Sequence, residues 1–222
     1  MTRKSFLARI VAIIVCEMSI VGGACGASLE PGSGIWSQSD VKPAENSDPA
    51  GVAKSPDRKY LIRNSAAGLE LFVKDKGSAL LDIVATDPLW EVVWPRSTRY
   101  FAINASDGGA VGTWETFAFK LAGTGKLVAF PVNKLVLAAA KSVPLCDSPE
   151  DPNISTVGWS KDGNTAFVLA EVPPHSSCRN MGEIRGFEVS VKESRIVKQL
   201  SEREVRHRWF VLLGCRFRRE CA

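Results

Sequence analysis

Residues 157–171, VGWSKDGNTAFVLAE, combine a tryptophan, a short polar turn and an alternating apolar run. Asp162 and Gly163 are residue types that reverse the chain, and the β-branched and aromatic residues after them suit a pleated strand. The stretch therefore predicts a turn that leads into a β-strand. Whether this hairpin is isolated or is the unit of a repeat depends on the rest of the chain.

The same pattern occurs twice earlier, at residues 53–65 (AKSPDRKYLIRNS) and 92–106 (VVWPRSTRYFAINAS). A second alternating hairpin follows each copy, beginning at Leu69, Trp114 and Phe187. Each unit thus holds four short strands, and the units recur at spacings of about 40 and then 65 residues, which is typical of propeller blades. The opening stretch is therefore a repeat.

This pattern resembles the TolB-like and WD-like β-propeller repeats of bacterial envelope proteins. Those repeats read tryptophan-serine-proline-aspartate-glycine, then a strand, then a hairpin that ends in leucine-threonine or leucine-serine. Residues 159–163 (WSKDG) match closely, residues 55–57 (SPD) match in part, and residues 199–201 (QLS) match the ending. The middle copy, residues 94–97 (WPRS), lacks the Asp-Gly pair. The resemblance covers roughly residues 52–213 and implies a fold rather than an activity, because this scaffold hosts many unrelated functions.

The predicted fold is all-β, a propeller-like array of three to four four-stranded antiparallel blades. An alanine-rich segment, residues 132–143, predicts a short helix inserted between the second and third blades. Residues 206–218 (RHRWFVLLGCRFR) are interpreted as a first strand of a fourth blade. Propellers usually need four to eight blades to close. We therefore expect an open array, a half-ring completed by a partner or second copy, or a ring with missing blades; closure through the N-terminal arm is the other alternative.

Residues 1–27 have the basic start, apolar centre and small-residue end of a secretory signal peptide. Cys25 follows two small residues, which resembles the lipidation box of bacterial lipoproteins and makes a lipid anchor the alternative. Residues 28–51 are rich in Pro, Gly, Ser and acidic residues and predict a flexible linker, in which Ile35 and Trp36 are the candidates for docking onto the body. The repeat domain then covers residues 52–222, and we expect a periplasmic or secreted location.

The cysteines beyond the signal segment are Cys146, Cys178, Cys215 and Cys221. An even number in an exported chain predicts two disulfides, and pairing of neighbours along the chain gives 146 with 178 and 215 with 221. Zinc sites need closely spaced ligand pairs, which are missing here, so we expect no metal and no cofactor. The net charge of +4 is too small to indicate nucleic-acid binding. The basic C-terminal residues Arg216, Arg218 and Arg219 form a solvated tail or contact an anionic surface.

Catalytic patterns are missing from the sequence. The two histidines, His175 and His207, lie in a loop and in a basic run, and no nucleophile elbow, zinc-protease motif or P-loop accompanies them. We therefore predict no catalytic residue. The alternative is a glycan- or peptide-acting hydrolase with paired carboxylates at the blade mouths. Its candidate acids lie in the second blade and the loop after it: Asp87, Glu91, Asp107, Glu115, Asp147, Glu150 and Asp151.

Tryptophans are the better indication of function. Most should pack between sheets, but aromatic residues at a blade mouth are typical binding residues for a protein partner. The candidates for binding are Trp90, Trp94, Trp114, Trp159 and Trp209. We therefore expect an exported, non-enzymatic interaction module of the bacterial envelope, with an envelope protein as partner, or a second copy that completes the propeller.

Overall fold

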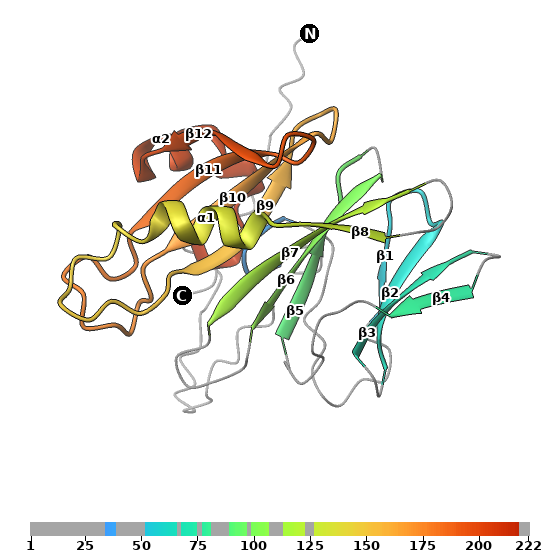
Figure 1. Cartoon of the computed structure of the whole chain (residues 1–222), viewed down its shortest axis with the longest axis horizontal. Coiled ribbons are helices and arrows are strands. Elements are labelled where there is room, and N and C mark those ends of the chain that lie inside the picture. The colour runs from blue at the N-terminus through green and yellow to red at the C-terminus, as the bar shows by residue number, and fades with distance from the viewer. Residues whose placement is uncertain are drawn as a thin grey trace, which may run out of the picture.

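Three antiparallel sheets of four strands each make up most of the computed structural model (Figure 1). The structure describes residues 34–38, 52–65, 68–74, 77–80, 89–96, 99–106, 113–122 and 127–217. Within each sheet the strands follow one another in chain order, so every sheet is a meander and forms one blade. The predicted fold class is confirmed, with three blades in the described part of the chain.

Blade 1 contains β1 (Val52–Lys54), β2 (Tyr60–Ser65), β3 (Gly68–Val73) and β4 (Gly77–Leu80). Blade 2 contains β5 (Leu89–Val93), β6 (Tyr100–Ser106), β7 (Trp114–Leu121) and β8 (Leu127–Phe130). Blade 3 contains β9 (Asn153–Trp159), β10 (Thr165–Glu171), β11 (Ile184–Ser190) and β12 (Arg195–Leu200). In blade 3 the first strand is wholly buried and the last is mostly exposed, and in blade 2 the first strand is likewise more buried than the last, so these two meanders run from a buried to an exposed edge.

The turns of blades 1 and 3 are built in the same way. In blade 3 the Ser160 hydroxyl donates to Asp162, and it also accepts the Thr165 N–H at 3.0 Å. In blade 1 the Ser55 hydroxyl donates to Asp57, and it accepts the Tyr60 N–H at the same distance. Such serine and aspartate side chains stabilise a turn because they satisfy backbone groups that the strands leave free. The sequence repeat is therefore a repeat of hydrogen bonds as well.

The left-handed residue of each of these turns follows the aspartate. Gly163 has φ 73°, which suits glycine, whereas the equivalent Arg58 adopts φ 58° despite its side chain. In blade 2 Pro95 replaces the serine and removes its hydroxyl. One backbone bond is nevertheless common to all three blades. It runs from the end of the third strand back to the residue before the second strand: Lys74 N to Lys59 O, Leu121 N to Arg99 O, and Val191 N to Asn164 O.

The helix predicted between blades 2 and 3 is confirmed as α1 (Val132–Ala140). Its buried face, Val132, Val136 and Ala140, packs in one core with residues of blades 2 and 3. The helix itself lies against the strands of these two blades (Figure 1). A second core joins blade 1 to blade 2, with Ile62 and Leu71 packed against Phe101 and its neighbours. The blades are therefore held together by apolar burial between their faces.

The prediction of a fourth-blade strand at residues 206–218 is wrong. The described part of this segment is helical: α2 (Glu202–Arg208) is followed by the 3-10 helices η1 (Phe210–Leu212) and η2 (Cys215–Phe217). A capping box starts α2, because Ser201 and Glu204 satisfy each other's backbone N–H groups. Val205 and Trp209 then pack on the second face of blade 3, where a further blade would lie. The C-terminal segment thus covers that face, as capping units do in repeat proteins.

Residues 34–38, here called the strap, lie against the C-terminal segment. Ser37 forms a β-bridge with Leu213, and the carbonyls of Gly34, Ile35 and Trp36 accept N–H groups from residues 214–216. The Trp36 side chain is fully buried. The two ends of the described chain are therefore joined by backbone hydrogen bonds, although the strap falls inside the predicted linker 28–51.

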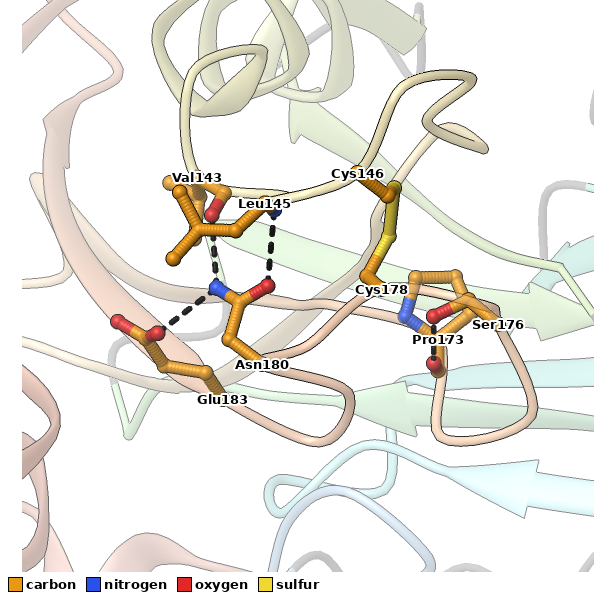
Figure 2. Close-up of a disulfide and its surroundings, with 8 residues drawn as sticks. All are labelled: Val143, Leu145, Cys146, Pro173, Ser176, Cys178, Asn180 and Glu183. Carbon is orange, nitrogen blue, oxygen red and sulfur yellow. Dashed lines mark hydrogen bonds between the residues drawn. A yellow bond between two sulfur atoms is a disulfide. The ribbon is translucent and has the colours of Figure 1, made fainter.

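The disulfide between Cys146 and Cys178 is present, as the sequence predicts. It ties the loop after α1 to the β10–β11 loop, and Figure 2 shows Asn180 beside it, bonded to the backbone of Val143 and Leu145 and to Glu183. Cys215 is disulfide-bonded as well, and its predicted partner, Cys221, lies outside the described residues. So do the signal segment 1–27 and Cys25.

Candidate functional site

A pocket of about 460 Å³ opens between the ends of β5 and β9, and we call it the interblade pocket. Two equivalent triplets of the repeat form most of it, residues 94–96 from blade 2 and residues 159–161 from blade 3. Both β5 and β9 are edge strands of their sheets, so the residues after them lie at the same mouth. The remaining lining residues are Gln38, Val93, Val157, Gly158 and Leu212.

The two tryptophans of the pocket are held by the blades on either side. The Trp94 ring packs on Phe101 with centroids 4.8 Å apart and stacks on Tyr60 of blade 1. Its indole Nε1 has no hydrogen-bond partner among the described residues, so ring packing alone positions it. Trp159 stacks on Tyr100 and donates its Nε1–H to the Val93 carbonyl at 2.9 Å. The aromatic wall is therefore rigid, which favours binding because little side-chain entropy is left to lose.

The rim of the pocket is cationic. Arg96 and Lys161 are exposed, and neither forms an ion pair with a described residue. The acid that follows Lys161, Asp162, does not line the pocket and is bonded to Ser160 and Asn164, which lower its pKa to about 2. No acidic side chain is among the lining residues. The pocket therefore combines apolar and aromatic walls with two available positive charges.

A second hollow of about 390 Å³ lies between the disulfide-linked loop and blade 3. Its cation, Arg185, is paired with Glu183 at 2.6 Å, and Glu183 is also bonded to Asn180. These groups already satisfy one another. The interblade pocket is the better binding candidate, because its two cations form no ion pair within the part of the chain that the structure describes.

The far wall of the interblade pocket comes from the two ends of the described chain. Gln38 of the strap donates its side-chain N–H to the Leu213 carbonyl at 2.8 Å, and its backbone N–H to the Leu212 carbonyl. The Leu212 side chain also lies close to Gly158, where an added Cβ would be 3.0 Å from its Cδ1. The pocket is therefore complete only while the strap and η1 are docked.

A buried carboxylate holds the strap in place. Glu91 on β5 is 2% exposed and accepts the Trp36 N–H at 3.1 Å, with further hydrogen bonds from Ile35 and Ser37. Burial raises its pKa from 4.5 to about 7, and these hydrogen bonds, with one from Asn104, oppose the rise. No described cation compensates this carboxylate. Glu91 therefore has a structural role beneath the strap, and it does not line the interblade pocket.

The Asn104 amide connects Glu91 to the edge of blade 3. Its Nδ2 donates to Glu91 and to the Thr156 carbonyl, both at 2.8 Å, while its Oδ1 accepts the Thr156 N–H. An edge strand exposes unpaired backbone groups, and this side chain satisfies them where β9 faces blade 2. The two blades are thus linked by a polar seam as well as by their apolar core.

The second buried carboxylate, Glu171, is paired rather than isolated. Arg216 donates to both of its oxygens, at 3.1 and 2.8 Å, and lies over the Trp36 ring at 4.9 Å. The prediction that Arg216 belongs to a solvated tail or an anionic surface contact is therefore wrong. Arg218 and Arg219 lie outside the described residues.

The other predicted site residues lie apart from the pocket. Trp90 packs between blades 1 and 2, and Trp114 and Trp209 pack beneath the strap and α2, all three with at most 5% exposure. None of the described acids of the hydrolase alternative lines the interblade pocket. Glu115, Asp147, Glu150 and Asp151 are exposed, Glu91 is buried under the strap, and Asp87 and Asp107 lie outside the described residues.

His175 lies in the β10–β11 loop and His207 on α2, and neither is among the residues that line the pocket. Among the described residues, no group of histidines, cysteines and acids is arranged to hold a metal ion. The described helices are all too short to span a membrane. Sequence reasoning identified Trp94 and Trp159 but missed Arg96 and Lys161, although both follow the tryptophan by two residues in the repeat.

No family model matches this chain, and no curated protein matches it in sequence. Among solved structures, dipeptidyl peptidase 4 from Porphyromonas gingivalis is similar to it, with 8% identity and a TM-score of 0.42. The match covers 68% of this chain and 25% of that chain, so this chain spans about a quarter of the length of that protein. A similarity this loose carries no information about activity.

Proposed function

We propose that this chain is an exported, non-enzymatic, propeller-like interaction module of the bacterial envelope, of the TolB-like or WD-like kind. Its binding surface is the interblade pocket, and its partner is another envelope protein. A second copy of the chain is the alternative occupant. The exported location rests on the signal-like residues 1–27 and agrees with the disulfide between Cys146 and Cys178, since disulfides persist mainly outside the cytoplasm.

One observation carries the proposal. The repeat places two tryptophan-cation triplets at one mouth, and the tryptophans are fixed by packing while the cations have no described partner. Aromatic residues and arginine are the side chains that most often dominate binding energy at protein interfaces. The volume of about 460 Å³ is enough for one or two side chains of a partner.

Affinity capture from crosslinked cells tests the proposal. The full chain, tagged at its C-terminus, is expressed in its native envelope together with Lys161→Trp, which fills the pocket mouth from an exposed position. The matched control is Lys192→Trp, an exposed lysine in the β11–β12 turn. We expect one stoichiometric partner with the wild-type chain and the control, and its loss with Lys161→Trp.

Two results would contradict the proposal. A partner that is captured equally by both variants would place the binding surface elsewhere. Turnover of a glycan or peptide by the purified chain, abolished by replacing a single acidic residue, would instead make the protein a hydrolase.

A further inference from the structure

We infer that the interblade pocket recognises an acidic protein segment, in which an Asp or Glu carboxylate lies beside an aromatic or aliphatic side chain. The inference rests on the proposed function and specifies its partner. It concerns the chemistry of the occupant, which the five candidate tryptophans by themselves do not define.

The charge of the lining determines the sign of the ligand. Arg96 and Lys161 contribute two positive charges, and the lining holds no acidic side chain. Neither cation is compensated by a described carboxylate, in contrast to Arg185 in the second hollow. A negatively charged group at the rim would therefore gain two favourable interactions without breaking an existing ion pair.

The walls determine what the carboxylate is attached to. Beneath the rim the pocket is lined by aliphatic and aromatic side chains, including Val93, Val157 and Leu212 beside the two tryptophans. An apolar group that enters this space is removed from water and contacts rigid rings. The segment should thus place an apolar side chain in the pocket and its carboxylate at the rim.

The hydrogen-bonding groups favour a peptide over a glycan. Sugar hydroxyls need acceptors as well as donors, and carboxylates and amides are the usual side-chain acceptors. Ser160 in the lining is already bonded to Asp162 and to the Thr165 N–H, and Gln38, which donates a side-chain N–H to Leu213, offers its amide oxygen as an acceptor. A polyhydroxylated ligand would therefore find few partners here.

Binding of a defined peptide tests the inference directly. The probe is the dye-labelled peptide Asp-Leu-Asp-Phe-Asp-Leu, compared with peptides that carry Asn or Lys in place of every Asp. Fluorescence anisotropy with the full oxidised chain should show the acidic peptide binding about tenfold more tightly than the lysine peptide. The affinity should fall as salt is raised, because rim charges are screened.

Charge reversal at the rim provides the specific control. Arg96→Glu and Lys161→Glu should each weaken binding about fivefold or more, whereas Lys192→Glu makes the same charge change outside the pocket and should have little effect. Thermal denaturation of each variant checks the fold; these three side chains are exposed, so we expect unchanged melting temperatures.

Three outcomes would overturn the inference: equal binding of the acidic, neutral and basic peptides, equal weakening by Lys192→Glu and Arg96→Glu, or binding of a uronic-acid oligosaccharide in preference to the acidic peptide. In each case a partner that is captured from cells and lost with Lys161→Trp would leave the proposed function standing. If no partner is captured from cells, or if Lys161→Trp captures it as well as wild type does, while the acidic peptide still binds, the proposed function is refuted instead.

Discussion

Replacement of Glu91 by Gln tests whether the strap is held by a titrating group. The native protein retains a proton on Glu91 up to about pH 7, whereas the unfolded chain releases it near pH 4.5. Between these values the native state binds more protons, so the free energy of unfolding falls as the pH rises. The contribution of Glu91 is fully present below pH 4.5 and lost as the pH passes 7.

The magnitude follows from the two pKa values. Each pH unit between them changes the free energy of unfolding by about 1.4 kcal/mol, so the whole interval corresponds to a contribution on the order of 3 kcal/mol. Gln cannot titrate, so the substitution also changes the free energy of unfolding by an amount that is the same at every pH. That amount cancels when the stability difference between wild type and variant is compared at two pH values. The difference in stability between wild type and Glu91→Gln should therefore fall by about 3 kcal/mol from pH 4.5 to pH 8.

Urea unfolding followed by tryptophan fluorescence measures this difference, because Trp36 is buried beside Glu91 and is released with the strap. Glu115→Gln is the matched control, the same substitution at an exposed acid in the same blade. A difference between wild type and Glu91→Gln that stays constant over this pH range would refute the reasoning. It would mean that the hydrogen bonds from the strap and Asn104 keep the carboxylate ionised despite its burial.

Three further changes test the packing. Cys146→Ser should lower the free energy of unfolding by about 3 kcal/mol, because a cross-link is lost. The melting temperature of the variant should be lower than that of wild type, and adding a reductant should lower it further by less than in wild type. Gly186→Ala should lower the free energy of unfolding in urea by about 1–3 kcal/mol, because the added Cβ would lie 2.5 Å from Cγ2 of Val205 on α2. Gly158→Ala should cost less, because its Cβ would meet the flexible end of the Leu212 side chain. Arg216→Met should lower the free energy of unfolding by about 2 kcal/mol, because Glu171 stays buried without its cation. The double variant Arg216→Met with Glu171→Gln should be more stable than Arg216→Met alone. Equal stability of the two would contradict the pairing.

The blades could be predicted because their signals are local. A serine and an aspartate two residues apart bond each other and the backbone within one turn, as Ser160 and Asp162 do, so the pattern recurs wherever the turn recurs. The inserted helix was predictable for the same reason, since helix propensity depends on neighbouring residues. The disulfide between Cys146 and Cys178 followed from the pairing of successive cysteines.

In the C-terminal segment, an apolar run was wrongly interpreted as a strand. Residues 206–217 suit a strand by composition, but the helix begins before them, at a capping box formed by Ser201 and Glu204. That S-x-x-E pattern was readable in the sequence and would have predicted a helix. The apolar run then serves to cover blade 3 rather than to form a strand of its own.

The sequence by itself determined the repeat, the turns and the residue types available for binding. Only the tertiary structure decided which triplets face one another, because Trp94 and Trp159 are 65 positions apart and meet through the packing of blades 2 and 3. It also decided that Glu91 is buried with no cation among the described residues to pair with, while Glu171 has Arg216, although both are glutamates in strands. Burial and pairing depend on which distant segments pack together, and local sequence patterns do not predict those contacts.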